Sequence, residues 1–269
     1  MARKHRISQN FLRSPRIALM LVGHSNIRKR DFTLDIGAGS GVFTFALSKK
    51  STQVLAIEFD GETFKKLKNN TKNLENVEVL RADFLHFNLS KLPQNYKVCA
   101  NIPFHLSSPI IQKLANAQNP PKSIYLILQK QFARKLIAGE QNFTSALGAK
   151  TFPFFENKIK KPLRKTDFTP PPAVETVFFE MKRRETPLIS KEEQPIFNDF
   201  IDKMFATPEF YKKHCGLKFK TKKPSELKGD EWIEIWQFSK NFDRMEELWH
   251  EKLSLKQLSL IKLPLADKP

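Results

Sequence analysis

The chain has 269 residues, and its 46 lysines and arginines outnumber its 28 aspartates and glutamates, giving a formal net charge of +18. Apolar residues make up 40% and aromatic residues 11%, proportions that exclude collagen-like, low-complexity and disordered sequence. The length allows one large domain, or a large and a small one. The charge favours a polyanionic partner such as a nucleic acid.

Cysteine use and hydropathy set the expected compartment. Cys99 and Cys215 are too few for a disulfide framework, and no signal-peptide pattern precedes them, so we expect a cytoplasmic protein. The longest apolar stretch near the start, Ile17 to Gly23, is too short to cross a bilayer. The six histidines lack ligand spacing, so no metal site is expected.

Short β-rich runs alternate with longer helical runs after an N-terminal arm whose first 30 residues include eight basic and no acidic residues. The expected strands are Phe32–Ile36, Gln53–Ile57, Val77–Arg81, Tyr96–Ala100 and Ser123–Leu128, and the expected helices are Val42–Lys50, Gly61–Lys72 and Ser107–Ala117. This order predicts an α/β fold with a doubly wound, mostly parallel sheet. Ala146–Phe155 and Ala173–Lys182 are predicted to be antiparallel edge strands.

The character of the chain changes after Arg184, where helical periodicity alternates with lysine-rich loops. We therefore predict a large domain over residues 1–184 and a small, basic, helical domain over residues 185–269. The three tryptophans, Trp232, Trp236 and Trp249, occur only in this second part. The i, i+4 spacing of Trp232 and Trp236 indicates one helix face, and a core role is favoured over base stacking.

A glycine-rich loop, Asp35-Ile36-Gly37-Ala38-Gly39-Ser40-Gly41, joins the first expected strand to a helix. Such glycines bring the backbone close to a ligand at a helix N-terminus. The third glycine comes one residue too early for a dinucleotide-binding loop. The pattern suits S-adenosylmethionine, which has an amino-acid tail and no pyrophosphate; a glycine-rich turn without a ligand is the alternative.

Acidic residues end the next two strands. Glu58 follows Gly37 by 21 residues, where a carboxylate can accept hydrogen bonds from both ribose hydroxyls. Asp83 follows the third strand, where it can accept from an adenine amino group. Either residue could instead be a surface acid or a helix cap. Three successive strand ends suited to an adenosine ligand favour the cofactor interpretation.

The fourth strand ends in Asn101-Ile102-Pro103-Phe104, a tetrapeptide suited to methylating the exocyclic amine of a nucleobase. The Asn101 oxygen and a backbone carbonyl can accept the two N–H bonds of this poorly nucleophilic amine. Pro103 fixes the loop and brings no competing N–H. Phe104 offers a flat face to an extruded base. No strong general base is required, so catalysis would consist of positioning and electrostatics.

Taken together, these motifs resemble the ribosomal-RNA adenine N6-dimethyltransferase superfamily over about residues 5 to 182. The matching segments are Ser8-Gln9-Asn10-Phe11-Leu12, the glycine loop, Glu58, Asp83, Asn101–Phe104 and Phe168-Thr169-Pro170-Pro171-Pro172-Ala173-Val174. The resemblance implies a Rossmann-like class I S-adenosylmethionine-dependent methyltransferase domain followed by a small all-helical C-terminal domain. It implies cofactor contacts from Asn10, Leu12, Gly37, Gly39, Glu58, Asp83 and Asn101, and stacking of the target adenine by Phe104 and Phe168.

Within this superfamily the sequence is more similar to the Erm branch, whose members methylate one adenine of 23S rRNA and confer macrolide–lincosamide–streptogramin B resistance. Small-subunit dimethylases usually have Asn-Leu-Pro-Tyr, whereas this chain has Ile102 and Phe104. Phenylalanine at the fourth position leaves the ratio of mono- to dimethylation open. The alternatives are a 16S rRNA dimethylase and a non-catalytic RNA-binding or transcription factor. DNA adenine methyltransferases typically carry Asp-Pro-Pro-Tyr instead.

Basic clusters predict the RNA-binding surface. The residues expected to contact RNA phosphates are Arg3, Lys4, Arg6, Lys160, Lys161 and Arg164. The lysine-rich run Lys212–Lys223 could serve solubility or contact RNA, and the sequence favours the two roles equally. The expected partner is 23S rRNA before assembly into the subunit, and the protein is expected to be a monomer.

Overall fold

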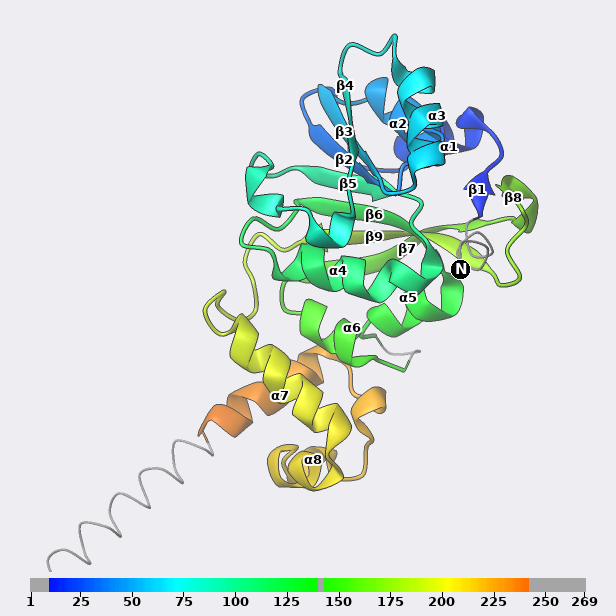
Figure 1. Ribbon diagram of the computed structural model, residues 1–269. Helices are drawn as coiled ribbons and strands as arrows, with labels where there is room; N and C mark the ends of the chain where they lie inside the picture. The colour runs from blue at the N-terminus through cyan, green and yellow to red at the C-terminus, as the bar shows by residue number, and fades with distance from the viewer. Residues whose placement is uncertain (1–9, 140–142, 242–269) are drawn as a thin grey trace, which may run out of the picture.

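A seven-stranded mixed sheet forms the centre of the computed structural model, which describes residues 10–139 and 143–241 (Figure 1). In spatial order its strands are β4 (Val77–Arg81), β3 (Gln53–Glu58), β2 (Phe32–Ile36), β5 (Lys97–Ala100), β6 (Ser123–Gln129), β9 (Thr176–Arg183) and β7 (Phe155–Leu163). The first five are parallel, and β9 and β7 are antiparallel to their neighbours. A separate antiparallel pair joins β1 (Phe11–Leu12) to β8 (Phe168–Thr169).

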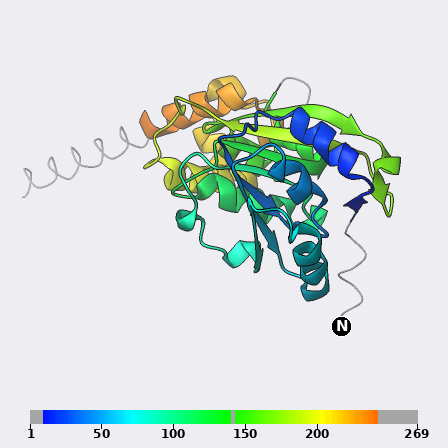
Figure 2. The same ribbon diagram turned by 90° about the horizontal axis from the view of Figure 1, so that it is seen from above.

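Helices cover both faces of the sheet (Figures 1 and 2). One face carries α1 (Pro15–Gly23), α2 (Val42–Ser48) and α3 (Gly61–Thr71), and the other carries α4 (Ser107–Asn116), α5 (Lys130–Leu136) and α6 (Ala146–Thr151). After β9 come α7 (Gln194–Ala206), α8 (Pro208–His214) and the helical residues 229–241. The short 3-10 turns are Phe84–His86, Leu89–Lys91, Phe104–Leu106, Lys165–Asp167, Leu217–Phe219 and Pro224–Glu226.

Side-chain alternation along β2 shows how the sequence builds the two layers. Leu34 and Ile36 are buried in the hydrophobic cluster on the α4 side. Asp35 points to the opposite face, where its Oδ2 accepts a hydrogen bond of 2.7 Å from the Thr44 hydroxyl of α2. Because helices cover both faces, the inner parallel strands β2, β3, β5 and β6 are largely buried on both sides, as expected for a doubly wound sheet. The predicted α/β class and mostly parallel sheet are confirmed.

The prediction that Ala146–Phe155 forms a strand is wrong, because most of this run is helix α6. Ser145 caps the helix, and its hydroxyl accepts a hydrogen bond from the Gly148 N–H at 3.1 Å. A Cβ on Gly148 would lie 2.5 Å from the Lys135 carbonyl oxygen, so α6 packs closely against α5. The edge strand begins only at Phe155. The strand predicted from Ala173 begins at Thr176 and is antiparallel as expected, but it lies between β6 and β7 and is not an edge strand.

The C-terminal helices pack through aromatic residues. The Trp236 ring lies 5.5 Å from Phe197 and 5.2 Å from Phe200 between ring centroids, and Trp232 stacks on Phe205 at 5.5 Å. The core role predicted for Trp232 and Trp236 is confirmed; Trp249 lies outside the described residues. These side chains belong to the same hydrophobic cluster as the α4 face of the sheet. The division at residue 184 therefore stays a prediction. No helix in the described part of the chain is long and apolar enough to span a membrane.

Candidate cofactor and adenine-binding site

The glycine loop lies at the carboxyl end of β2, where ligands bind in open α/β sheets. Gly37 and Gly39 have φ values of 64° and 60°, a conformation that other residues rarely adopt. The Gly37 N–H donates to the Ile57 carbonyl of β3 at 2.8 Å. A Cβ on Gly39 would lie 3.3 Å from the Phe11 ring, and one on Gly37 would lie 3.6 Å from Pro103. The loop thus lies between β1 and the tetrapeptide, so the predicted motifs meet in space.

Glu58 holds the glycine loop from the end of β3. Its side chain is almost wholly buried, at 4% exposure. Oε2 accepts a hydrogen bond from the Gly39 N–H at 2.8 Å, and Oε1 accepts one from the Asp60 N–H at 2.9 Å. Each carboxylate oxygen has two lone pairs, so both can also accept from ribose hydroxyls. The prediction that Glu58 binds ribose is compatible with this geometry.

Asp83 lies beside a cavity of about 480 Å³ at the carboxyl ends of β3 and β4, lined by Phe59, Asp60, Gly61, Arg81, Ala82 and Asp83. The Leu85 N–H donates to Oδ1 at 2.8 Å, and Oδ2 lies 2.8 Å from His86 Nδ1. The hydrogen bond from Leu85 holds the pKa of Asp83 below its usual range. Asp83 is therefore an ionised acceptor at neutral pH, as an adenine amino group requires.

The same cavity contains Phe59 and Arg81, which sequence reasoning missed. The Phe59 side chain is 70% exposed, immediately after Glu58. An aromatic residue directly after a strand-ending acid is the signal that could have identified it. Arg81 gave no signal, because its position in the cavity depends on how β4 packs beside α3.

The tetrapeptide follows β5, which flanks β2 on the side away from β3 and Glu58. Asn101 Nδ2 donates to the Asn10 carbonyl oxygen at 2.7 Å. A carbonyl can only accept, so this contact fixes the amide orientation and leaves Oδ1 as an acceptor. Ile102 is buried, and the Leu106 N–H donates to the Pro103 carbonyl at 2.9 Å, which fixes the turn. Asn10 and Asn101 are therefore in direct contact, 91 positions apart.

The two phenylalanines predicted to stack on the adenine differ in exposure. Phe104 is partly buried and packs against the cluster that contains Phe168 and Leu12. Phe168 has no exposed surface, because β8 pairs with β1 and places Phe168 opposite Leu12. Phe104 is therefore the more accessible ring. Stacking by Phe168 stays a prediction, and it would require that side chain to leave its buried position.

Three of the six basic residues predicted to bind RNA, Lys160, Lys161 and Arg164, lie on β7 or directly after it. Lys160 Nζ is 3.7 Å from the buried carboxylate of Glu180, which also binds Lys158 at 3.0 Å. Lys161 and Arg164 make no ion pair with the described residues. Arg3, Lys4 and Arg6 lie outside the described residues. No group of three metal-ligating side chains occurs within residues 10–139 and 143–241.

Asp35 lies directly beneath the glycine loop and is only 1% exposed. Burial, with the nearby Glu58 charge, raises the pKa of Asp35 to about 7. Asp35 Oδ1 has no hydrogen-bond partner among the described residues. The carboxyl group is thus protonated more readily in the folded protein than in the unfolded chain, where the pKa is about 4.

The Asp35 carboxyl predicts a pH-dependent stability. As pH rises from about 4 to about 7, Asp35 ionises in the unfolded chain before it ionises in the folded one, which destabilises the fold by up to a few kcal/mol. Asp35→Asn removes this contribution, so its free energy of unfolding relative to wild type should increase across that range. Urea unfolding at pH 5 and pH 8 measures the difference, and equal differences at both pH values would contradict the assigned pKa.

The fold, with its glycine loop, strand-end acids and a cavity at the carboxyl ends of β3 and β4, defines a class I S-adenosylmethionine-dependent methyltransferase. The family model for ribosomal RNA adenine dimethylases matches residues 2–209, and the chain belongs to this family. It is an rRNA adenine N6-methyltransferase that uses S-adenosylmethionine.

Named relatives come from two groups. The chain is 31% identical over 212 residues to ribosomal RNA small subunit methyltransferase A of Latilactobacillus sakei, covering 76% of this chain and 71% of the relative. It is 35% identical over 196 residues to an rRNA adenine N-6-methyltransferase of Staphylococcus aureus, covering 73% and 78%.

Solved structures support the fold. The crystal structure of 23S rRNA methyltransferase ErmE has a TM-score of 0.71 at 22% identity, over 86% of this chain and 100% of that one. A dimethyladenosine transferase from Plasmodium falciparum has a TM-score of 0.66 at 21% identity, over 86% and 98%.

Proposed function

We propose that this protein transfers methyl groups to the N6 of one adenine of 23S rRNA and thereby confers macrolide–lincosamide–streptogramin B resistance, as Erm-type enzymes do. The observation that carries the proposal is the tetrapeptide Asn101-Ile102-Pro103-Phe104, with Ile102 and Phe104 where small-subunit enzymes usually have leucine and tyrosine. The chain is also more similar to the Staphylococcus aureus rRNA adenine N-6-methyltransferase, at 35% identity, than to the small-subunit enzyme of Latilactobacillus sakei, at 31%.

The proposed chemistry depends on how Asn101, Ile102 and Phe104 orient the N6 amine of the target adenine. Asn101 Oδ1, held by the bond from Nδ2 to Asn10, accepts one N6–H of the target adenine. The Ile102 carbonyl accepts the other, and Phe104 stacks on the base. When bound, S-adenosylmethionine supplies an electrophilic methyl group. These contacts favour a tetrahedral N6 with an available lone pair, and the methylated nitrogen releases its proton without a dedicated base.

Cofactor contacts are proposed for Asn10, Leu12, Gly37, Gly39, Glu58, Asp83 and Asn101. The left-handed glycines and the Glu58 bridge to Gly39 provide a close backbone approach for such a ligand. Asp83 would accept a hydrogen bond from the amino group of the cofactor adenine, at the end of the site away from Asn101. In this assignment the adenosine lies at the carboxyl ends of β3 and β4, and the methyl donor lies near Asn101.

A second candidate is methylation of 16S rRNA. It is favoured by the relatives named ribosomal RNA small subunit methyltransferase A, including the one from Latilactobacillus sakei. The two candidates use the same chemistry and the same site. They differ in the RNA that delivers the adenine, so only a substrate comparison separates them.

Radiolabelled methyl transfer provides that comparison. The purified protein is incubated with labelled S-adenosylmethionine and either protein-free 23S rRNA or 30S precursor particles. The proposal predicts label in protein-free 23S rRNA, in which the loops and junctions that can present an extruded adenine are accessible. The Asn101→Ala protein provides the background for both reactions. Label confined to the small-subunit substrate would reject the 23S proposal.

Lys161 and Arg164 are proposed phosphate contacts, and their charge reversal should weaken RNA binding. Each lost phosphate contact lowers the slope of log affinity against log salt by roughly 0.7–0.9, so Lys161→Glu with Arg164→Glu should flatten this slope by about 1.5. Filter binding to a 23S rRNA hairpin at several salt concentrations measures it. The control is Lys66→Glu with Lys68→Glu, the same charge change on α3, which covers the opposite edge of the sheet. Equal slopes for both double variants would refute the contacts.

A further inference from the structure

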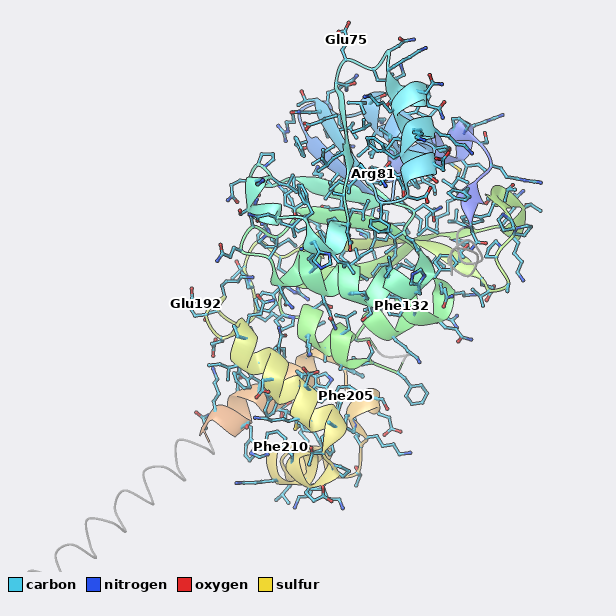
Figure 3. All side chains as sticks on the ribbon, viewed as in Figure 1. Glu75, Arg81, Phe132, Glu192, Phe205 and Phe210 are labelled. Atoms are coloured by element: carbon cyan, nitrogen blue, oxygen red, sulfur yellow. The ribbon has the colours of Figure 1, made fainter. Side chains whose placement is uncertain are left out.

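Arg81 is an exposed cation that lines the cavity at the carboxyl ends of β3 and β4, and the catalytic scheme has no role for it. It is the last residue of β4 and lies opposite Glu58 of β3 in the strand register. Its side chain makes no hydrogen bond or ion pair with the described residues. Figure 3 shows Arg81 near α3, and its guanidinium lies over Gly61, the first residue of that helix.

The cavity also contains an exposed ring. Phe59 is 70% exposed and lines the same cavity as Arg81 and Asp83. An aromatic ring and a guanidinium plane both pack favourably against a flat π system. A cavity that contains both, with an acceptor at Asp83, is suited to a purine base.

The charges around Arg81 argue against a phosphate as its ligand. Asp60 and Asp83 line the same cavity, and a low pKa keeps Asp83 ionised. The two carboxylates in this cavity would repel a phosphate, whereas an uncharged base bears no such penalty. The neighbours of Arg81 therefore favour adenine over the RNA backbone.

We propose that Arg81 binds the adenine of the cofactor, packing its guanidinium against the base, and so sets the affinity for S-adenosylmethionine and its product. The proposal rests on the cofactor site and is independent of which rRNA is methylated. In this proposal Arg81 binds the adenosine part of the cofactor and does not act on the methyl transfer at Asn101.

Gly61 offers a way to move the guanidinium without removing its charge. A Cβ on Gly61 would lie 2.9 Å from Arg81 Nη2 and 3.1 Å from Cζ, which is too close. Gly61→Ala should therefore displace the flexible end of Arg81 from its present position. Alanine is also a better helix former than glycine, so this variant should keep its fold.

Calorimetric titration with S-adenosylhomocysteine tests the proposal without turnover. Arg81→Ala is expected to raise the Kd about 3- to 10-fold, the range for a stacked cation. Gly61→Ala should raise it similarly, and should have no further effect in the Arg81→Ala background. 5′-Methylthioadenosine, which retains the adenosine, should show the same fold-change. Arg134→Ala, a change at an exposed arginine of α5, is the matched control and should leave the Kd unchanged.

The outcomes separate cofactor binding from the other roles of an arginine. An unchanged Kd for S-adenosylhomocysteine in folded Arg81→Ala protein, as judged by thermal unfolding, would overturn the proposal. So would a loss of rRNA affinity with unchanged cofactor affinity, because that result would assign Arg81 to a phosphate. If Arg81→Ala fails to fold, the Gly61→Ala titration decides: an unchanged Kd there would also reject the proposal.

Discussion

Asn101→Ala is expected to lower the methyl-transfer rate by at least about 10²-fold while leaving rRNA binding near the wild-type level. The variant loses the Oδ1 acceptor for the target N6 and the bond that ties Asn101 to the Asn10 carbonyl. Removal of one oriented polar group that stabilises a transition state costs about 10²–10³-fold in other enzymes. Single-turnover methylation with saturating RNA and cofactor measures the rate.

Two comparisons test the specificity of this effect. Asn73→Ala changes an exposed asparagine after α3 and should retain full activity. Phe104→Tyr should retain most activity because the ring face remains, whereas Phe104→Ala should lose turnover. An Asn101→Ala enzyme with near-normal turnover would show that the amine is oriented by other groups.

Glu58→Ala should cause the largest loss of cofactor affinity, about 10- to 100-fold or more. The substitution removes the proposed ribose acceptor and both hydrogen bonds that the carboxylate accepts from Gly39 and Asp60. Hydrogen bonds to charged groups contribute about 1.5–3 kcal/mol each, and a buried N–H left without a partner adds a further cost. Calorimetry with S-adenosylhomocysteine measures the affinity.

Glu75→Ala is the matched control, because Glu75 is an exposed acid at the far end of the α3–β4 connection (Figure 3). Its cofactor affinity should equal that of the wild type. Circular dichroism of Glu58→Ala distinguishes local loss of the loop from global unfolding. Wild-type affinity in folded Glu58→Ala protein would refute the ribose assignment.

The sequence was sufficient to predict the five parallel strands of the sheet, because strands buried between helices form short apolar runs bounded by turn residues. The glycine loop and Glu58 were also predictable, because both stand at fixed distances from strand ends. The run Ala146–Phe155 was not, since a short apolar run fits a strand and a helix equally well. Its Ser145 cap was the overlooked local signal.

Contacts between distant segments explain the remaining differences. The burial of Phe168 follows from the pairing of β8 with β1, a contact between residues more than 150 positions apart. The ion pair of Lys160 with Glu180 depends on the register of β7 against β9. Likewise, Phe59 and Arg81 line the same cavity because β3 and β4 are neighbours in the sheet. No local pattern in the sequence encodes which of these segments become neighbours.

The most direct test of the central claim is mass-spectrometric mapping of methylated adenines in rRNA from cells that express the protein. Nuclease fragments of 23S and 16S rRNA are compared with those from cells expressing the Asn101→Ala variant, and the method detects mono- and dimethyladenine alike. The account predicts a new N6-methylated adenine at a single position of 23S rRNA, in the peptidyl-transferase region, that is absent with Asn101→Ala. New methylation found only in 16S rRNA, or found equally with Asn101→Ala, would contradict it.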